Sequence, residues 1–184
     1  MRMSAREAAP ATAARNVAKT LAQTVVFWAV FLFVVPLLIV RLEGRFVGGL
    51  SFASPAGRIA GSVGFVLAGT LGLWSGATMA VVGRGTPLPS DCARTLVIAG
   101  PYRWVRNPMA IAGLAQGACV GVYLGSPLTL GYVLAGALIW DHFVRRWEEA
   151  DLAARFGEPY RRYQHAVRCW IPRARPYRPQ AERR

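Results

Sequence analysis

Histidine and cysteine are scarce in this chain of 184 residues, and their scarcity excludes several kinds of site. The residues of these two types are His142, His165, Cys92, Cys119 and Cys169. None of them stands at a recognised metal-ligand spacing, which argues against a zinc or iron enzyme. The cysteines also form no CxxC motif and no pairing pattern, so they are typical of free thiols in a reducing compartment or in a membrane.

Charged residues are also few. They make up 17% of the chain against 54% hydrophobic residues, a combination that soluble domains of this length rarely show. The formal net charge is nevertheless +13, and all but one of the basic residues are arginines. Nucleic-acid-binding proteins carry such a charge, but here the basic residues flank apolar runs instead of forming one face. The pattern favours a protein embedded in a lipid bilayer. The Arg-rich and Ala-rich composition is typical of a bacterial source.

An almost unbroken apolar run occupies residues 21–40. About 20 residues at a rise of about 1.5 Å each span a hydrocarbon core of about 30 Å, so the run predicts a transmembrane helix. Arg41 follows directly, without the small-residue cleavage site of a signal peptide, which favours a retained helix. We expect Pro36 to kink this helix. Residues 1–20 are expected to form a loose or surface-lying arm on the cytoplasmic side.

Three further apolar segments predict three more spans, at residues 59–82, 108–124 and 128–144. Residues 21–83 would hold the first two helices. The last two segments are short for full crossings and are joined by a Gly-Ser-Pro turn, which is typical of a tight helical hairpin. Two stripes of small residues at four-residue intervals predict close contacts between helices. These stripes are Ala68, Gly72 and Gly76, and Gly113, Gly117 and Gly121.

The distribution of basic residues predicts the orientation. With four spans and a cytoplasmic N-terminus, nineteen basic residues fall inside and three outside. The sequence therefore predicts an all-α, multi-pass protein of the inner (cytoplasmic) membrane, with both termini in the cytoplasm. Two polar stretches fall on that side, at residues 94–113 and 145–163, and we expect them to meet there.

Five short motifs occur in order along the second half of the chain: LVxxGPYRxxRNPM, a Gly-spaced apolar hairpin, EExxL, FGxxYxxY and WIPR. Together, over residues 85–177, they resemble the isoprenylcysteine carboxyl methyltransferase family, whose wider membrane methyltransferase group includes phospholipid N-methyltransferases. The resemblance implies that residues 84–184 form a methyltransferase core, in which the cytoplasmic loop and a C-terminal helical tail hold S-adenosylmethionine. One departure is Asn107, because better-known eukaryotic members have a histidine there.

The resemblance also implies roles for individual residues. The implied cofactor-binding residues are Arg94, Thr95, Leu96, Val97, Tyr102, Arg106, Asn107, Pro108, Met109, Ala110, Glu148 and Glu149. Arg145, Glu148 and Asn107 are the candidate catalytic residues. No GxGxxG motif follows a strand-like run, which excludes a soluble Rossmann methyltransferase.

Methyl transfer from a sulfonium donor is an in-line displacement that requires positioning and no metal. Tyr102 and Trp104 are candidates for a cation–π contact with the sulfonium. Arg103, Arg106 or Arg145 would bind a substrate carboxylate. An ionised carboxylate needs no base, whereas an amine must lose a proton, and the sequence offers no obvious base. The favoured function is O-methylation of a carboxylate on a lipophilic acceptor, with N-methylation of a phospholipid or other amine as the alternative.

Several of these residues also have a simpler explanation. Trp104 is typical of an interfacial aromatic belt, and Tyr160 and Tyr163 are expected to pack the tail onto the core. Asp141 and His142 fit either the membrane boundary or the pocket. A non-catalytic helical scaffold or transport component, which uses the Gly stripes for assembly, is the alternative from a different class.

Overall fold

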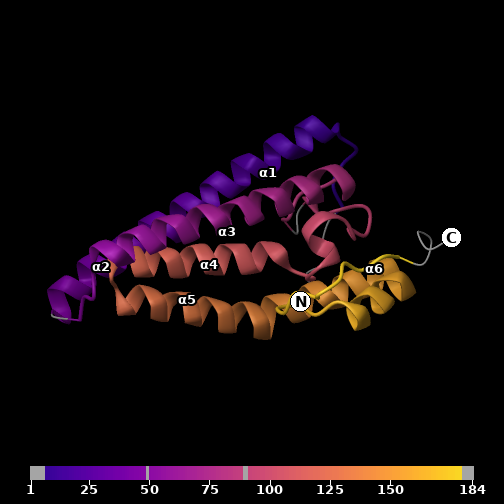
Figure 1. Ribbon diagram of the computed structural model, residues 1–184. Coiled ribbons are helices and arrows are strands. Elements are labelled where there is room, and N and C mark those ends of the chain that lie inside the picture. The colour runs from indigo at the N-terminus through magenta and orange to yellow at the C-terminus, as the bar shows by residue number, and fades with distance from the viewer. Residues whose placement is uncertain (1–6, 49, 89–90, 180–184) are drawn as a thin grey trace.

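The computed structural model describes residues 7–48, 50–88 and 91–179, and this part of the chain holds helices and no β-strand. The elements are α1 (Ala13–Phe27), the π-helical η1 (Trp28–Val34), α2 (Val35–Phe46), α3 (Pro55–Val82), the 3₁₀ turn η3 (Gly100–Arg103), α4 (Pro108–Leu124), α5 (Pro127–Ile139), the π-helical η4 (Trp140–Val144) and α6 (Arg145–Ala166). Apart from η3, these elements form four helical rods (Figure 1). The first rod is the continuous helix of α1, η1 and α2, the second is α3, the third is α4, and the fourth is the continuous helix of α5, η4 and α6.

The prediction of an all-α integral membrane protein is confirmed. Three rods are long and apolar enough to cross a membrane, and α4 is a shorter apolar helix. In the most apolar stretch of each of these three rods, only 11%, 22% and 6% of the residues are buried within the protein. Most of their apolar side chains therefore face outward, which is stable only in hydrocarbon.

The first rod is longer than the apolar run predicted. It starts at Ala13, where the Thr12 hydroxyl accepts a hydrogen bond from the Arg15 amide at 3.3 Å, and it continues through Arg41 to Phe46. Residues 13–20, expected in a loose arm, are thus helical. The π-helical turns of η1 end just before Pro36. A proline nitrogen has no hydrogen to donate, so the helix lacks one backbone hydrogen bond at Pro36, and the π-helical turns lie next to that gap.

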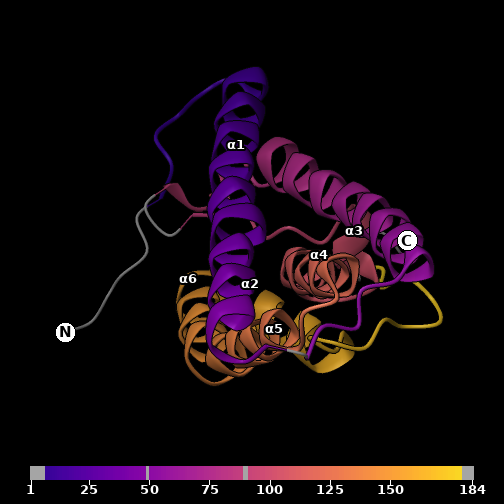
Figure 2. The ribbon, with the colours of Figure 1, turned by 90° about the vertical axis from the view of Figure 1, so that its left-hand side faces the viewer.

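The third predicted span is confirmed in its bounds, since α4 covers Pro108–Leu124. The second ends at Val82 as predicted, but α3 begins at Pro55, four residues before the predicted start. The two helices approach closely because α3 presents glycines to α4. A Cβ atom on Gly61 would lie 2.7 Å from the Cys119 carbonyl oxygen, and one on Gly72 would lie 3.4 Å from the Ala112 Cβ. Figure 2 looks along the bundle and shows α4 between α3 and α5.

The fourth span does not end at the membrane boundary but continues as a helix into the charged segment. It starts after a turn in which Gly125 has φ +64° and the Ser126 hydroxyl caps α5. Its apolar part, residues 127–144, already covers about 27 Å at about 1.5 Å per residue, so α6 lies outside the hydrocarbon core. The helix is interrupted once, at Gly157, whose φ is +57°.

This geometry gives the bundle one polar end. There α6 lies beside the loop between α3 and α4, and α1 begins at the same end, while the turn before α5 and the end of α2 lie at the opposite end (Figure 1).

Candidate functional site

The loop between α3 and α4 is fastened to the end of α3. The Thr95 hydroxyl donates to the Val82 carbonyl at 2.6 Å, and the Arg94 amide donates to the Gly83 carbonyl at 2.7 Å. Gly100 then makes a tight turn with φ +51°, where a Cβ atom would lie 2.9 Å from the Thr78 hydroxyl oxygen. Only glycine fits such a turn without strain. The turn directs Tyr102 into the protein, where it is 5% exposed.

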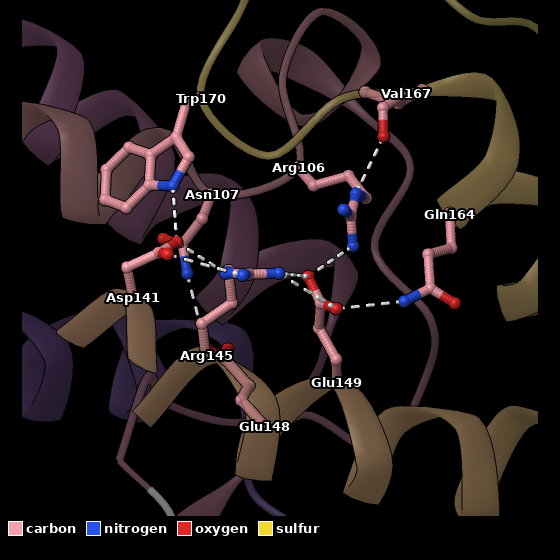
Figure 3. Close-up of polar contacts among 9 residues, drawn as sticks. All are labelled: Arg106, Asn107, Asp141, Arg145, Glu148, Glu149, Gln164, Val167 and Trp170. Carbon is pink, nitrogen blue, oxygen red and sulfur yellow. Dashed lines mark hydrogen bonds and ion pairs between the residues drawn. The ribbon is translucent and has the colours of Figure 1, made fainter. Parts of the chain in front are cut away.

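The two polar stretches meet, as predicted. Arg106 Nη1 lies 2.6 Å from Glu149 Oε1, and the Asn107 amide donates to Glu148 Oε2 at 3.3 Å (Figure 3). The Asn107 side-chain oxygen meanwhile accepts from the Ala110 amide at 3.0 Å and caps α4. One asparagine therefore both starts a membrane helix and contacts the acidic pair on α6.

Arg145 links the acidic pair to Asp141. Its Nε lies 2.6 Å from Asp141 Oδ1, and its Nη1 lies 3.4 Å from Glu149 Oε1 (Figure 3). Asp141 also accepts from the Trp170 indole at 2.7 Å, and Glu149 accepts from the Gln164 amide at 2.9 Å. Asp141 thus joins the hydrogen-bond network of Arg145, although it does not line the cleft between the loop and α6. Its neighbour His142 is exposed and contacts the carbonyl of its own helix at Leu138.

The C-terminal tail runs along the loop and covers the site. The Arg106 amide donates to the Arg168 carbonyl at 3.0 Å, and the Tyr177 amide donates to the Arg103 carbonyl at 2.8 Å. The Tyr163 hydroxyl donates to the Tyr102 carbonyl at 2.6 Å. Tyr163 also belongs to a buried cluster with Tyr160 and Val167, so the prediction that the tyrosines pack the tail onto the core is confirmed.

A cleft of about 80 Å³ lies between the loop and α6. Eight of the twelve expected cofactor-binding residues line it, together with Arg145 from the candidate catalytic set; the eight are Thr95, Leu96, Val97, Tyr102, Arg106, Asn107, Glu148 and Glu149. Sequence reasoning missed part of the wall, namely Met79, Ala93, Trp140, Leu152, Phe156 and Cys169. Tyr160 and Tyr163, which were expected only to pack the tail onto the core, line the cleft as well. Of the missed residues, Leu152 and Phe156 lie one and two turns beyond Glu148 on α6, a helical spacing that was available as a signal.

Four expected residues do not line the cleft. Arg94 is exposed, while Pro108 is buried at the first turn of α4. Met109 and Ala110 line a second cavity instead, because successive residues of a helix point about 100° apart and leave the face of Asn107. Trp104 also lies outside the cleft and is 39% exposed, in keeping with an interfacial aromatic.

Two groups in the cleft have unusual electrostatics. The Tyr102 hydroxyl is buried and has no hydrogen-bond partner in the described part of the chain, and burial together with the Glu148 carboxylate raises its pKa. Burial, reinforced by the neighbouring charge of Glu149, raises the pKa of the Glu148 carboxyl to about 7. Glu148 lies in α6, beyond the spanning residues 127–144. It can therefore exchange a proton near neutral pH.

The second cavity is larger, about 690 Å³, and lies within the membrane part of the bundle. Its walls come mostly from α1 and η1, α4, and α5 with η4, and are completed by Gly72 of α3 and by Pro87 and Leu88 of the loop. Gly113 opens it, since nothing lies within 4 Å of a Cβ atom placed there. The expectation that the whole stripe packs helices is therefore wrong at Gly113, although Gly117 and Gly121 do contact α5. Trp140 lines both this cavity and the cleft, which places the two side by side.

A profile of the phospholipid methyltransferase family matches residues 57–159. The match runs from the first turn of α3 to the kink of α6 and so contains the loop, the hairpin and the acidic pair. It begins earlier than the motifs in the sequence indicated, and it includes α3. Searches among curated proteins and among solved structures gave no match. Because the profile covers more than half of the chain, the protein belongs to the phospholipid methyltransferase family, within the isoprenylcysteine carboxyl methyltransferase-like group of membrane methyltransferases.

Proposed function

We propose that this protein transfers a methyl group from S-adenosylmethionine to an amine on a lipophilic acceptor at the membrane boundary. The observation that carries this proposal is that two spaces adjoin: a cleft that contains the proton-exchanging carboxyl group of Glu148, and a membrane cavity that shares Trp140 as a wall.

The residues of the cleft fit the cofactor chemically. When bound, S-adenosylmethionine supplies an electrophilic methyl group on a sulfonium cation. Glu148 and Glu149 would accept hydrogen bonds from its ammonium or ribose hydroxyl groups, and the unpartnered Tyr102 hydroxyl would gain a partner. Trp140 and Phe156 offer aromatic faces to a cation or a base.

The cleft must widen before it can hold the cofactor. Small-molecule sites usually enclose about 300–1,000 Å³, and this cleft has about 80 Å³. Arg145 lines it and is held there by Asp141 and Glu149. We infer that this guanidinium swings aside when the cofactor enters, and that until then it offsets part of the charge of Glu149.

Glu148 supplies the base that an amine acceptor requires. A protonated amine must lose its proton before its nitrogen lone pair can form the new bond to carbon, and a general base works best with a pKa near the working pH. The Glu148 carboxylate takes that proton, while Asn107 holds one of its oxygens at 3.3 Å. The tail that covers the site keeps water from competing.

A carboxylate acceptor is the second candidate, and Arg106 and Arg145 at the cleft are the observation in its favour. Both guanidinium groups are already paired with carboxylates of the protein, so a substrate carboxylate would have to replace Glu149 or Asp141. This competition makes us favour the amine.

The larger cavity suits the apolar part of the acceptor. Its walls are mostly aliphatic and aromatic, and it sits among the helices that cross the bilayer. We expect the protein to lie in the inner membrane with this end and both termini in the cytoplasm, because the basic residues concentrate there and S-adenosylmethionine is made there.

A transfer assay tests the function. Purified protein is incubated with cofactor labelled in the methyl group and with a total lipid extract. We expect label in lipid that resists mild base, as a methylated amine does, whereas base-labile label would indicate a methyl ester. If a helical scaffold were the function instead, no lipid would be labelled and Glu148→Gln would be harmless, while Gly117→Leu would abolish function.

A further inference from the structure

Both guanidinium groups of the cleft contact the same carboxylate. Arg106 Nη1 lies 2.6 Å from Glu149 Oε1, and Arg145 Nη1 lies 3.4 Å from the same oxygen (Figure 3). Glu148 lines the cleft one position earlier on α6, and among the described residues it forms no ion pair. Its carboxylate accepts a hydrogen bond from the neutral Asn107 amide at 3.3 Å. Glu148 therefore offers the cleft a carboxyl group without a counterion.

The ionisable groups around Glu148 leave it short of positive charge. They are Glu149, Asp151 and Tyr160 on α6, Tyr102 and Arg106 in the loop, and Cys169 in the tail. The two acids add negative charge, and the guanidinium is bound to Glu149. Burial raises the pKa of both tyrosines and of the cysteine, so these three are neutral at physiological pH. In the free protein Glu148 thus keeps its proton up to about pH 7, the value to which its pKa is raised.

We propose that Glu148 distinguishes the methyl-bearing sulfonium form of the cofactor from the neutral thioether left after transfer, because Glu148 gives up its proton when a ligand cation lies beside it. The proton passes to solvent, and no covalent bond of the cofactor changes in this step. A sulfonium supplies the missing counterion, whereas a thioether does not. The contact is stronger here than in water because the cleft is narrow and covered by the tail.

This inference rests on the proposed function, because it takes the ligand cation to be the methyl donor. It adds a link between the donor and the base: Glu148 is ionised while the donor still carries its methyl group. During transfer Glu148 takes the proton of the amine, and the sulfonium charge disappears as the thioether forms. The spent cofactor then lacks an ionic partner at Glu148 and is held more weakly.

Binding without turnover tests the proposal. Calorimetric titrations in detergent use three probes: S-adenosylmethionine, the thioether S-adenosylhomocysteine, and sinefungin, which carries an amino group in place of the methylsulfonium. All three have the same amino-acid end, so its titration cancels when their affinities are compared. The comparison isolates the charge at the position of the sulfur.

We expect the affinity for S-adenosylmethionine, relative to that for S-adenosylhomocysteine, to rise by up to about tenfold per pH unit from about pH 5.5 to about pH 7. It should then level off, since above that range Glu148 is already ionised. Near pH 6, titrations in buffers of different ionisation enthalpy should count about one proton released with S-adenosylmethionine or sinefungin and none with S-adenosylhomocysteine.

Glu148→Gln should remove both the pH dependence of the affinity ratio and the proton release. The matched control is Glu158→Gln, because Glu158 is exposed on the same helix, and it should behave like the wild type. If Glu148→Gln does not fold, the pH series on wild-type protein decides alone.

Equal proton release with the thioether would assign Glu148 to the ammonium group that both ligands share, and it would overturn the proposal. An affinity ratio that does not change with pH would overturn it as well, although the proposed function would stand because both ligands bind. Folded wild-type protein that binds none of the three probes would contradict the proposed function together with this inference.

Discussion

Arg106 Nη1 and Glu149 Oε1 lie 2.6 Å apart although 43 positions separate the two residues in the sequence. Arg106 also donates from Nε to the Val167 carbonyl at 2.7 Å. One guanidinium thus joins the loop before α4, the helix after α5 and the C-terminal tail. The cleft exists because these three segments are held together at one end of the bundle.

Removing this guanidinium should destabilise the polar end. Arg106→Ala leaves the Glu149 carboxylate unpaired on that side, and the loss of one partner of a largely buried pair costs about 3–5 kcal/mol. Both side chains are mostly buried, at 13% and 17% exposed. The control is Arg146→Ala, because Arg146 is exposed and such surface changes stay within about 0.5 kcal/mol. Thermal unfolding in detergent measures both variants, and an equal Tm for the two would show that the pair is unimportant.

The stability of the protein should depend on pH through Glu148. Its ordinary pKa is 4.5, and in the folded protein the pKa is raised to about 7. Between these values the folded form keeps a proton that the unfolded form has lost. The contribution of Glu148 to stability is therefore complete below about pH 4.5 and is lost as the pH rises to about 7. The glutamine of Glu148→Gln stays neutral, so the Tm of this variant should rise relative to the wild-type Tm as the pH increases from about 4.5 to about 7. A constant difference from pH 4.5 to pH 8 would argue against the raised pKa.

The Tyr102 hydroxyl should serve binding and not folding. It is buried without a hydrogen-bond partner in the described residues, so Tyr102→Phe should leave the Tm unchanged or raise it. The same variant should bind S-adenosylmethionine about 3- to 10-fold more weakly, because one hydrogen bond to the ligand is lost. Isothermal titration gives the affinity. Tyr123→Phe, on the far side of the bundle, is the control and should bind normally. If Tyr102→Phe binds S-adenosylmethionine as tightly as the wild type does, the Tyr102 hydroxyl does not contact the cofactor.

Substitution by alanine should lower the stability of the protein at Gly61 but not at Gly113. At Gly61 the new Cβ atom would meet the Cys119 carbonyl oxygen at 2.7 Å, which is backbone and cannot turn away. Gly61→Ala should therefore cost about 1–3 kcal/mol. At Gly113 nothing lies within 4 Å, so Gly113→Ala should not destabilise the protein. The Tm of the two variants decides the matter, and a larger loss at Gly113 would contradict the cavity beside it.

Much of the fold was readable from the sequence because hydrocarbon imposes simple rules on composition. Apolar runs, prolines and glycines placed α3, α4 and the turn at Gly125 correctly. The ends of the first rod were missed because helix formation does not stop where hydrophobicity stops: Thr12 caps the helix well before the apolar run begins. The charged helix α6 was likewise expected as a separate tail, since nothing in its composition shows that it continues α5.

The site was predictable as far as neighbouring polar motifs could be paired. Asn107, Glu148 and Glu149 meet as expected, because the turn before α4 and the segment after α5 must share one membrane face. The direction of each side chain was harder. Met109 and Ala110 follow Asn107 in the motif but turn into the membrane cavity. The raised pKa of Glu148 depends on burial beneath a folded tail, which no local pattern encodes.

The central claim is that the loop before α4 and the first turns of α6 close around S-adenosylmethionine. Titration of the cofactor into folded wild-type protein and into Glu148→Ala, by calorimetry in detergent, tests it most directly. We expect saturable binding by wild-type protein and at least about a tenfold loss of affinity in the variant, since a charged hydrogen-bond partner is worth about 1.5–3 kcal/mol. Folded wild-type protein that does not bind the cofactor, or a variant that binds it equally well, would contradict the account.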